Sequence, residues 1–160
     1  MAILTLTGRA AVAALIKEGP LYMAWGTGDA AWDTTPVAPV ASDSALEAEL
    51  GRRLVETISF CEPDAGGTIE FPDGAKYSTT TDPTGYLYIR VTFGFTDEPT
   101  ATIREVALYQ GTVPATGHEA DTYLAVANVQ TAGLLMTLDR VPKIVRSSSY
   151  REIFELVLTI

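Results

Sequence analysis

The sequence has very few of the side chains on which enzymes and metal sites depend. Its 160 residues include one cysteine, Cys61, and one histidine, His118. A single cysteine excludes an internal disulfide framework and any metal site built from several cysteines. A single histidine leaves little scope for the usual base of nucleophilic catalysis. We therefore expect no catalytic, cofactor-binding or metal-binding residues, and no enzyme activity.

The sequence also lacks long apolar runs and an excess of basic residues. No run approaches the roughly 20 apolar residues of a membrane helix, and residues 1–8 lack the positive start of a secretory signal. Lys and Arg total 11 against 20 Asp and Glu, which gives a net charge of -9. We expect synthesis in the cytoplasm, with neither a membrane nor a nucleic acid as partner.

The chain does contain enough apolar material for one core. Hydrophobic residues make up 47% of it, and a domain near this length buries about 70% of its unfolded surface without disulfides or metals. We predict a single β-rich domain over residues 1–160, in which a helical N-terminal part, residues 1–52, packs on the sheet.

Two short helices are predicted in the N-terminal third. Residues 7–18 are rich in alanine and are followed by Gly19 and a proline, which stop a helix. Residues 45–50 follow Ser44, which has capping-box spacing to Glu47. We expect both segments to be helical.

After residue 53 the sequence is typical of strands separated by turns rich in Gly, Pro and Asp. The clearest strand is 86–95, in which apolar and polar side chains alternate, as in a half-buried antiparallel strand. The predicted fold is mainly β, an antiparallel sandwich or a barrel-like sheet with two short helices. The predicted strands are 21–25, 54–61, 68–71, 75–79, 86–95, 102–109, 122–128, 134–138 and 152–160.

Candidate functional residues are few. His118 lies in a polar stretch that is typical of an exposed loop, and Asp29 and Asp33 lack the ligand spacing of a calcium loop. The aromatic residues around the Gly26 turn are either a lid on the core, which we favour, or interface anchors. These interface candidates are Tyr22, Trp25 and Trp32.

Three segments resemble a family of bacteriophage tail structural proteins found at the base of tail-collar fibres and in baseplate and neck components. The first joins a strand, a Gly-x-Gly turn and a short helix that ends in arginine. The second is a strand in which Glu precedes an apolar, small, Leu and aromatic run. The third is a final hairpin with a serine-rich turn. The first segment comprises residues 23–28 and 41–53, the second comprises residues 103–109, and the third comprises residues 140–143 and 152–160.

The resemblance implies a virion protein of the phage tail that assembles with itself, as a ring or trimer, and with other tail proteins. Fibres of this kind continue into a long shaft, whereas this chain stops at Ile160. We therefore expect a compact adaptor, such as a baseplate, neck or collar subunit or a tail-fibre attachment component.

Two other functions stay open at this point. A carbohydrate-binding β-sandwich module for host-surface attachment would need exposed rings at Trp25, Trp32, Tyr86 and Tyr88. A hydrolase would rest on Asp29, Asp33 and His118 alone.

Overall fold

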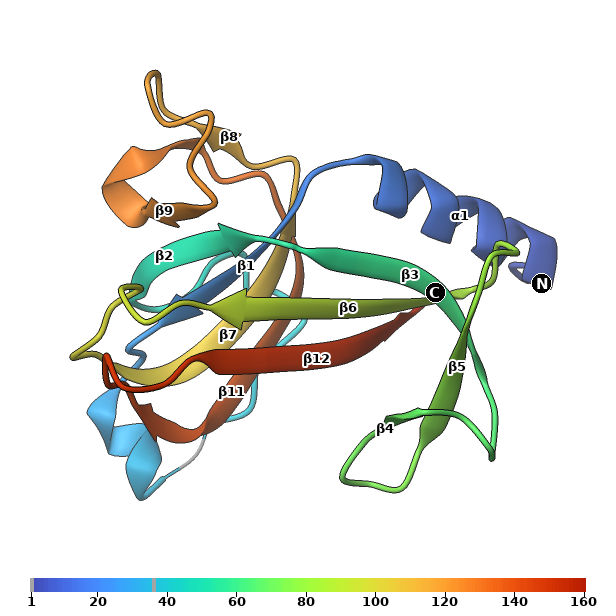
Figure 1. Cartoon of the computed structure of the whole chain (residues 1–160), viewed down its shortest axis with the longest axis horizontal. Coiled ribbons are helices and arrows are strands. Elements are labelled where there is room, and N and C mark those ends of the chain that lie inside the picture. The colour runs from blue at the N-terminus through green and yellow to red at the C-terminus, as the bar shows by residue number, and fades with distance from the viewer. Residues whose placement is uncertain (1, 36) are drawn as a thin grey trace. The chain divides into compact units, whose positions relative to one another are not determined.

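The computed structural model describes residues 2–35 and 37–160, and the fold is mainly β (Figure 1). Its elements are α1 (Leu6–Glu18), β1 (Leu21–Gly26), η1 (Ala30–Asp33), β2 (Glu49–Leu54), β3 (Thr57–Pro63), β4 (Ile69–Glu70), β5 (Lys76–Thr80), β6 (Tyr86–Phe93), β7 (Thr102–Gln110), β8 (Val113–Pro114), β9 (Tyr123–Ala125), η2 (Val126–Asn128), β10 (Val129–Thr131), β11 (Leu134–Val145) and β12 (Glu152–Thr159). A long loop follows β1, residues 27–35 and 37–48, and it contains one short 3-10 helix, η1.

Helix α1 confirms the first predicted helix. Thr5 caps its start by accepting a hydrogen bond from the backbone N–H of Gly8 at 3.2 Å. Its end is fixed by Gly19, whose N–H donates to the Ile16 carbonyl at 3.3 Å. Within the described residues, no helix has both the length and the apolar character that crossing a bilayer requires.

The second predicted helix, 45–50, is wrong. Residues 41–48 are turns and bends, and β2 begins at Glu49. A helix this short is marginal on its own, and the sheet offers its backbone better partners. β2 pairs with β1 on one side and with β9 on the other. The prediction of a mainly β fold with antiparallel sheets is confirmed. The prediction of two helices is wrong, because the described residues contain one α-helix.

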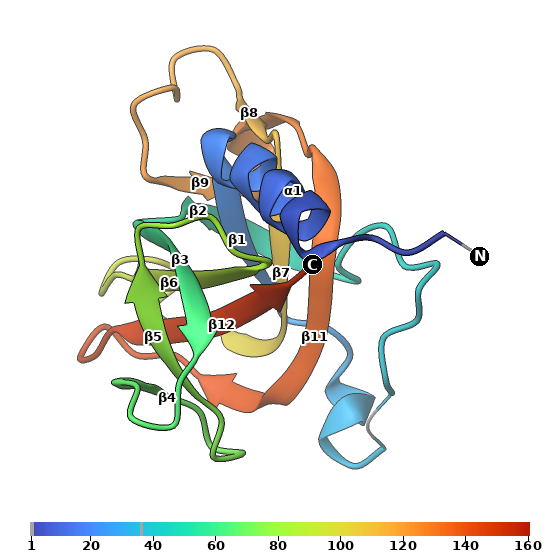
Figure 2. The ribbon, with the colours of Figure 1, turned by 90° about the vertical axis from the view of Figure 1, so that its right-hand side faces the viewer.

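The first sheet has five strands in the order β11-β7-β1-β2-β9. β1 lies at its centre, and all six β1 residues are buried. Met23 pairs with Leu108 of β7 on one side and with Arg53 of β2 on the other. β11 is longer than the predicted strand 134–138, and residues 27–35 and 37–48 run beside it (Figure 2).

The second sheet has the order β12-β6-β3-β5-β4, and β8 and β10 form a separate two-stranded sheet. β6 alternates buried and half-buried residues as predicted. It ends at Phe93, however, two residues before the predicted end. Phe95 lies beyond the strand, and its side chain is 43% exposed.

The chain divides into two compact units, each with its own buried residues. One contains residues 2–19, 56–90 and 154–160, and the other contains residues 20–35, 37–55 and 91–153. The predicted single domain and the packing of residues 1–52 on the sheet stay predictions. In the second unit the core is built around Trp25, whose ring stacks on Phe93 with centroids 3.6 Å apart.

Candidate functional site

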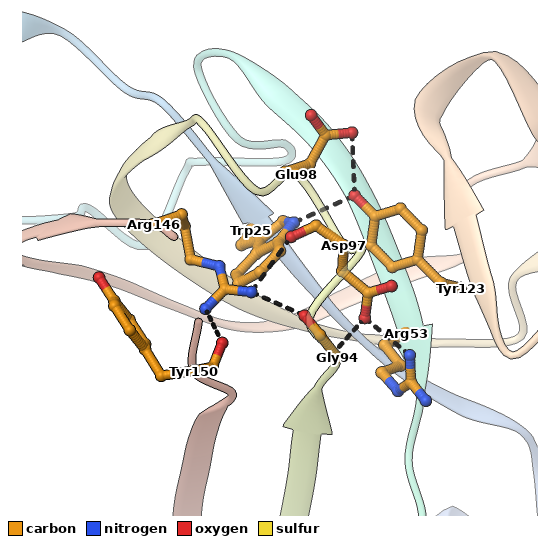
Figure 3. A network of polar contacts seen from close by, with 8 residues as sticks. All are labelled: Trp25, Arg53, Gly94, Asp97, Glu98, Tyr123, Arg146 and Tyr150. Carbon is orange, nitrogen blue, oxygen red and sulfur yellow. Dashed lines mark hydrogen bonds and ion pairs between the residues drawn. The ribbon is translucent and has the colours of Figure 1, made fainter. Parts of the chain in front are cut away.

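A turn after β6, residues 94–101, is held by the buried carboxylate of Asp97 (Figure 3). Asp97 accepts a hydrogen bond from the backbone N–H of Gly94 at 2.7 Å and another from Arg53 Nη1 of β2 at 2.7 Å. Charge-assisted hydrogen bonds of this kind are roughly twice as strong as neutral ones. Asp97 therefore ties the turn to the first sheet.

Arg146 joins the same turn to the segment between β11 and β12. Its buried guanidinium donates to the carbonyl oxygens of Gly94 at 2.7 Å, Asp97 at 3.3 Å and Tyr150 at 3.3 Å (Figure 3). The guanidinium carbon also lies 5.1 Å from the centre of the Trp25 ring. One buried cation thus binds three carbonyl oxygens and holds the two segments together.

Tyr123 of β9 completes the network. Its hydroxyl oxygen accepts from Trp25 Nε1 at 3.2 Å, and its O–H donates to Glu98 at 3.4 Å (Figure 3). Burial raises the pKa of Tyr123 above its ordinary value, so the phenol stays protonated at neutral pH. Glu98 has φ of 45°, a left-handed backbone that is strained for a residue other than glycine.

Beside this network lies a hollow of about 660 Å³. Phe95 and Arg151 form part of its wall, and the Arg151 guanidinium lies 4.7 Å from the centre of the Phe95 ring. Its lining also includes Asp121, Thr122 and residues of the 94–97 turn. These groups can bind a partner, but they do not align a base with a nucleophile as catalysis requires.

The long loop after β1 is fastened to β7 and β11 by charged side chains. Asp33 accepts from Arg104 at 2.8 and 3.0 Å and from Lys143 at 3.1 Å. The hydrogen bond from Arg104 is the main cause that lowers the pKa of Asp33 to about 2. Arg140 donates to the carbonyl oxygens of Val37 and Ala38 at 3.1 and 2.9 Å. These contacts hold the loop against the edge strand.

Trp32 lies inside this fastening. The Arg140 guanidinium is 4.5 Å from the centre of its ring. The ring also lies so close to Gly28, where φ is 53°, that a Cβ there would collide with it. Trp32 therefore secures the loop, and its ring is only partly exposed.

Glu105 is a fully buried carboxylate that the sequence analysis did not single out. It accepts hydrogen bonds from the backbone N–H groups of Glu47 at 3.0 Å and Ala48 at 2.9 Å. The sequence signal for such a role is weak, since Glu105 directly follows Arg104 in a strand that is only partly apolar. Glu105 joins the first two segments of the phage-tail resemblance.

Arg52 is a second buried charge, and it binds Glu49 through two hydrogen bonds at 2.8 and 2.7 Å. It also donates to the Thr112 hydroxyl at 2.7 Å and to the Ala132 carbonyl at 2.6 Å. Its guanidinium lies 4.1 Å from the centre of the Tyr109 ring. The buried charges of the first sheet thus anchor loops and strand ends.

The structure separates the predicted candidates by burial. Tyr22 and Trp25 are buried in the core, as the lid interpretation favours, and their use as interface anchors stays a prediction. His118 contacts the Asp121 carboxylate at 2.7 Å in an exposed turn. Asp29 accepts from the Ala31 N–H and so caps η1. In the part of the chain that the structure describes, no three His, Cys, Asp or Glu side chains cluster as metal ligands do.

The fold and these contacts define a mainly β protein whose charged side chains hold loops and turns in place. The family model described as "Baseplate wedge 3 tail fiber network component" matches residues 1–160. The chain therefore belongs to this family of phage baseplate proteins, which confirms the resemblance to tail structural proteins and gives the protein its place in the virion tail. No curated protein matches the sequence significantly.

Proposed function

We propose that this chain is an assembly component of the baseplate that acts through protein–protein contacts and catalyses no reaction. The observation that carries the proposal is the match of a baseplate tail-fibre network family to all 160 residues. The buried charges support it, because Asp97, Arg146 and Glu105 fix backbone segments and so give the surface a defined shape.

The contact surface that we propose lies around Phe95. Phe95, Tyr150 and Arg151 are exposed and close in the fold, since the Arg151 guanidinium lies over the Phe95 ring. Aromatic residues and arginine carry much of the binding energy at protein interfaces. The hollow of about 660 Å³ next to them offers room for a side chain of the partner. We assign the partner as another protein of the phage tail.

Binding to neighbouring tail proteins tests the proposal. Phe95→Asp should weaken binding at least about tenfold, which corresponds to about 1.4 kcal/mol. Val126→Asp is the matched control, since Val126 is an aliphatic residue that is 50% exposed elsewhere in the same unit. Sedimentation of the chain with each tail protein measures the affinity. A chain that binds none of these proteins would refute the assembly function.

The oligomeric state is part of the same proposal. We expect the chain to form a homo-oligomer, a ring or a trimer, because most homo-oligomers have closed point-group symmetry. Light scattering of the purified chain measures the copy number.

No observation favours the carbohydrate-binding alternative. It requires an exposed set of aromatic rings, whereas Trp25 is fully buried and Trp32 is covered in part by Arg140. The hydrolase alternative is equally unsupported, because Asp33 is held by Arg104 and Lys143 and His118 contacts Asp121.

A further inference from the structure

Strand β12 forms one edge of the second sheet, beside β6 (Figure 1). Within the described residues, no strand pairs with its other side. β12 is eight residues long and contains no proline, glycine or lysine. Natural proteins keep edge strands short or interrupt them with proline or a bulge, because an unpaired edge binds other strands. β12 is neither short nor interrupted by proline.

The other edge strands among the described residues are short or interrupted. β4 and β8 have two residues each, and β9 and β10 have three each. β11 is long, but its register with β7 shifts between Arg140 and Ile144, and Pro142 lies within this shift. Of the described edges, only β12 is a long strand without proline, so it is the edge that best fits another strand.

One hydrogen bond fixes which backbone groups of β12 face outward. The Ile160 N–H, just after the strand, donates to the carbonyl of Gly85, just before β6, at 2.9 Å. In an extended strand the N–H and C=O groups of successive residues point to opposite sides. The backbone groups of every second residue before Ile160 therefore face β6. Those of Glu155, Val157 and Thr159 face away from it.

The side chains of β12 show that its inner face is incompletely covered. Glu155 contacts Arg90 of β6 at 3.3 Å, so these two side chains share one face of the sheet. Leu156 and Leu158 point to the opposite face, where Leu87 of β6 is fully buried. Both β12 leucines are only half-buried. Apolar side chains from one more strand would complete their cover.

We infer that β12 binds an extended segment of another tail protein, which joins the five-stranded second sheet as a sixth strand. This inference rests on the proposed assembly function. The outward backbone groups of Glu155, Val157 and Thr159 bind the backbone of the segment. Alternate side chains of the segment are apolar and cover Leu156 and Leu158. The residue opposite Glu155 is basic, because opposite charges stabilise such a cross-strand pair.

A second copy of β12 suits this edge less well. Two antiparallel copies that continue the sheet across a two-fold axis must pair odd-numbered residues with odd-numbered ones, since only then does the same face stay outward. The registers with the longest overlap place Glu155 directly opposite or diagonal to Glu155 of the second copy. Like charges in these positions repel. The partner is therefore a different protein.

Amide hydrogen exchange, resolved by NMR, tests the inference directly. In the free chain, the amides of Glu155, Val157 and Thr159 should exchange at least about tenfold faster than those of Leu156 and Leu158, which face β6. Binding of a tail protein should slow the first three at least about tenfold. Protection of these three amides in the dilute free chain would show that the edge is already covered and would overturn the inference. Protection that requires only a higher concentration of the chain would assign the edge to a second copy, which overturns it too.

Substitutions at Val157 separate backbone recognition from side-chain recognition. Val157→Pro removes an N–H that faces away from β6, so the ladder with β6 is kept, and binding of the tail protein should weaken at least about tenfold. Val157→Ala is the matched control, because it shortens the side chain and keeps the N–H, and it should weaken binding less than about threefold. Sedimentation with each tail protein measures the affinities, and circular dichroism verifies that both variants are folded. Equal losses in the two variants would overturn the inference. If Val157→Pro does not fold, the exchange measurement on the natural chain decides.

The outcomes separate this inference from the assembly function. If Val157→Pro and the amide exchange of β12 show no effect while Phe95→Asp weakens binding, the added strand is wrong and the assembly function stands. If the natural chain binds no tail protein, the assembly function itself fails, and the inference fails with it.

Discussion

Gly26 faces Glu105 directly across the β1–β7 ladder, and the Glu105 carboxylate fills the space that a side chain at position 26 would need. The carboxylate then reaches the backbone N–H groups of Glu47 and Ala48, which precede β2. Gly26 in β1 thus leaves room for Glu105 of β7, which fixes the backbone just before β2.

Glu105→Gln should lower the free energy of unfolding by about 1–3 kcal/mol, because an amide offers one oxygen to two N–H donors and turns its own donor toward one of them. Urea unfolding followed by tryptophan fluorescence measures the change, since Trp25 and Trp32 belong to the same unit. Glu119→Gln, at an exposed carboxylate of the same unit that accepts from the Gly117 N–H, should cost less than about 1 kcal/mol. Equal costs at the two positions would contradict the anchoring role of Glu105.

Arg146→Met should destabilise the unit by about 3 kcal/mol, because methionine keeps the apolar stem and removes the charged donor to the carbonyl oxygens of Gly94 and Asp97. The control is Arg151→Met, which removes an exposed guanidinium over Phe95 and should cost under about 1 kcal/mol. The urea midpoints of the two variants give the comparison. The reverse order of the two costs would refute the structural role of Arg146.

Tyr123→Phe should cost about 1–2 kcal/mol and change the tryptophan emission, because the indole N–H of Trp25 loses its acceptor in a buried place. Tyr150→Phe removes a hydroxyl from an exposed ring, and there water can replace the lost contact. Fluorescence spectra and urea unfolding of both variants test this. An unchanged emission in Tyr123→Phe would show that the hydroxyl is not the partner of Trp25.

Acid should weaken the fastening of the long loop through Asp33. Its pKa is lowered from 3.8 to about 2 in the folded chain, so its contribution to stability is complete above pH 4 and is lost as the pH falls toward 2. The difference in urea midpoint between the natural chain and Asp33→Asn should therefore shrink between pH 5 and pH 2, most clearly at low salt. A difference that stays constant over this range would contradict the pairing with Arg104 and Lys143.

Local signals were enough to predict some elements. Helix α1 was predicted because alanine content and the following Gly19 act within the segment itself. The alternation in β6 was read correctly because one face is buried along the whole strand. The failure at 45–50 has a physical cause: partners of these residues lie in β1 and β7, far along the chain.

The contacts of the candidate site could not be predicted from the sequence, because the residues that make them lie far apart along the chain. Arg146 and Gly94 are 52 residues apart, and Arg53 and Asp97 are 44 apart, so no spacing rule connects them. The aromatic residues were predicted better. The core was favoured for Tyr22, Trp25 and Trp32 because large rings bury much apolar surface. Tyr22 and Trp25 are buried, whereas Trp32 is half-buried in the loop.

The central position of β1 has a mechanical consequence. Because β7 and β2 are hydrogen-bonded to its two edges, a pull along this strand must shear both ladders at once before the strand can slide. Load passed through the baseplate would therefore deform the loops and edge strands first, and the middle of the sheet would yield last.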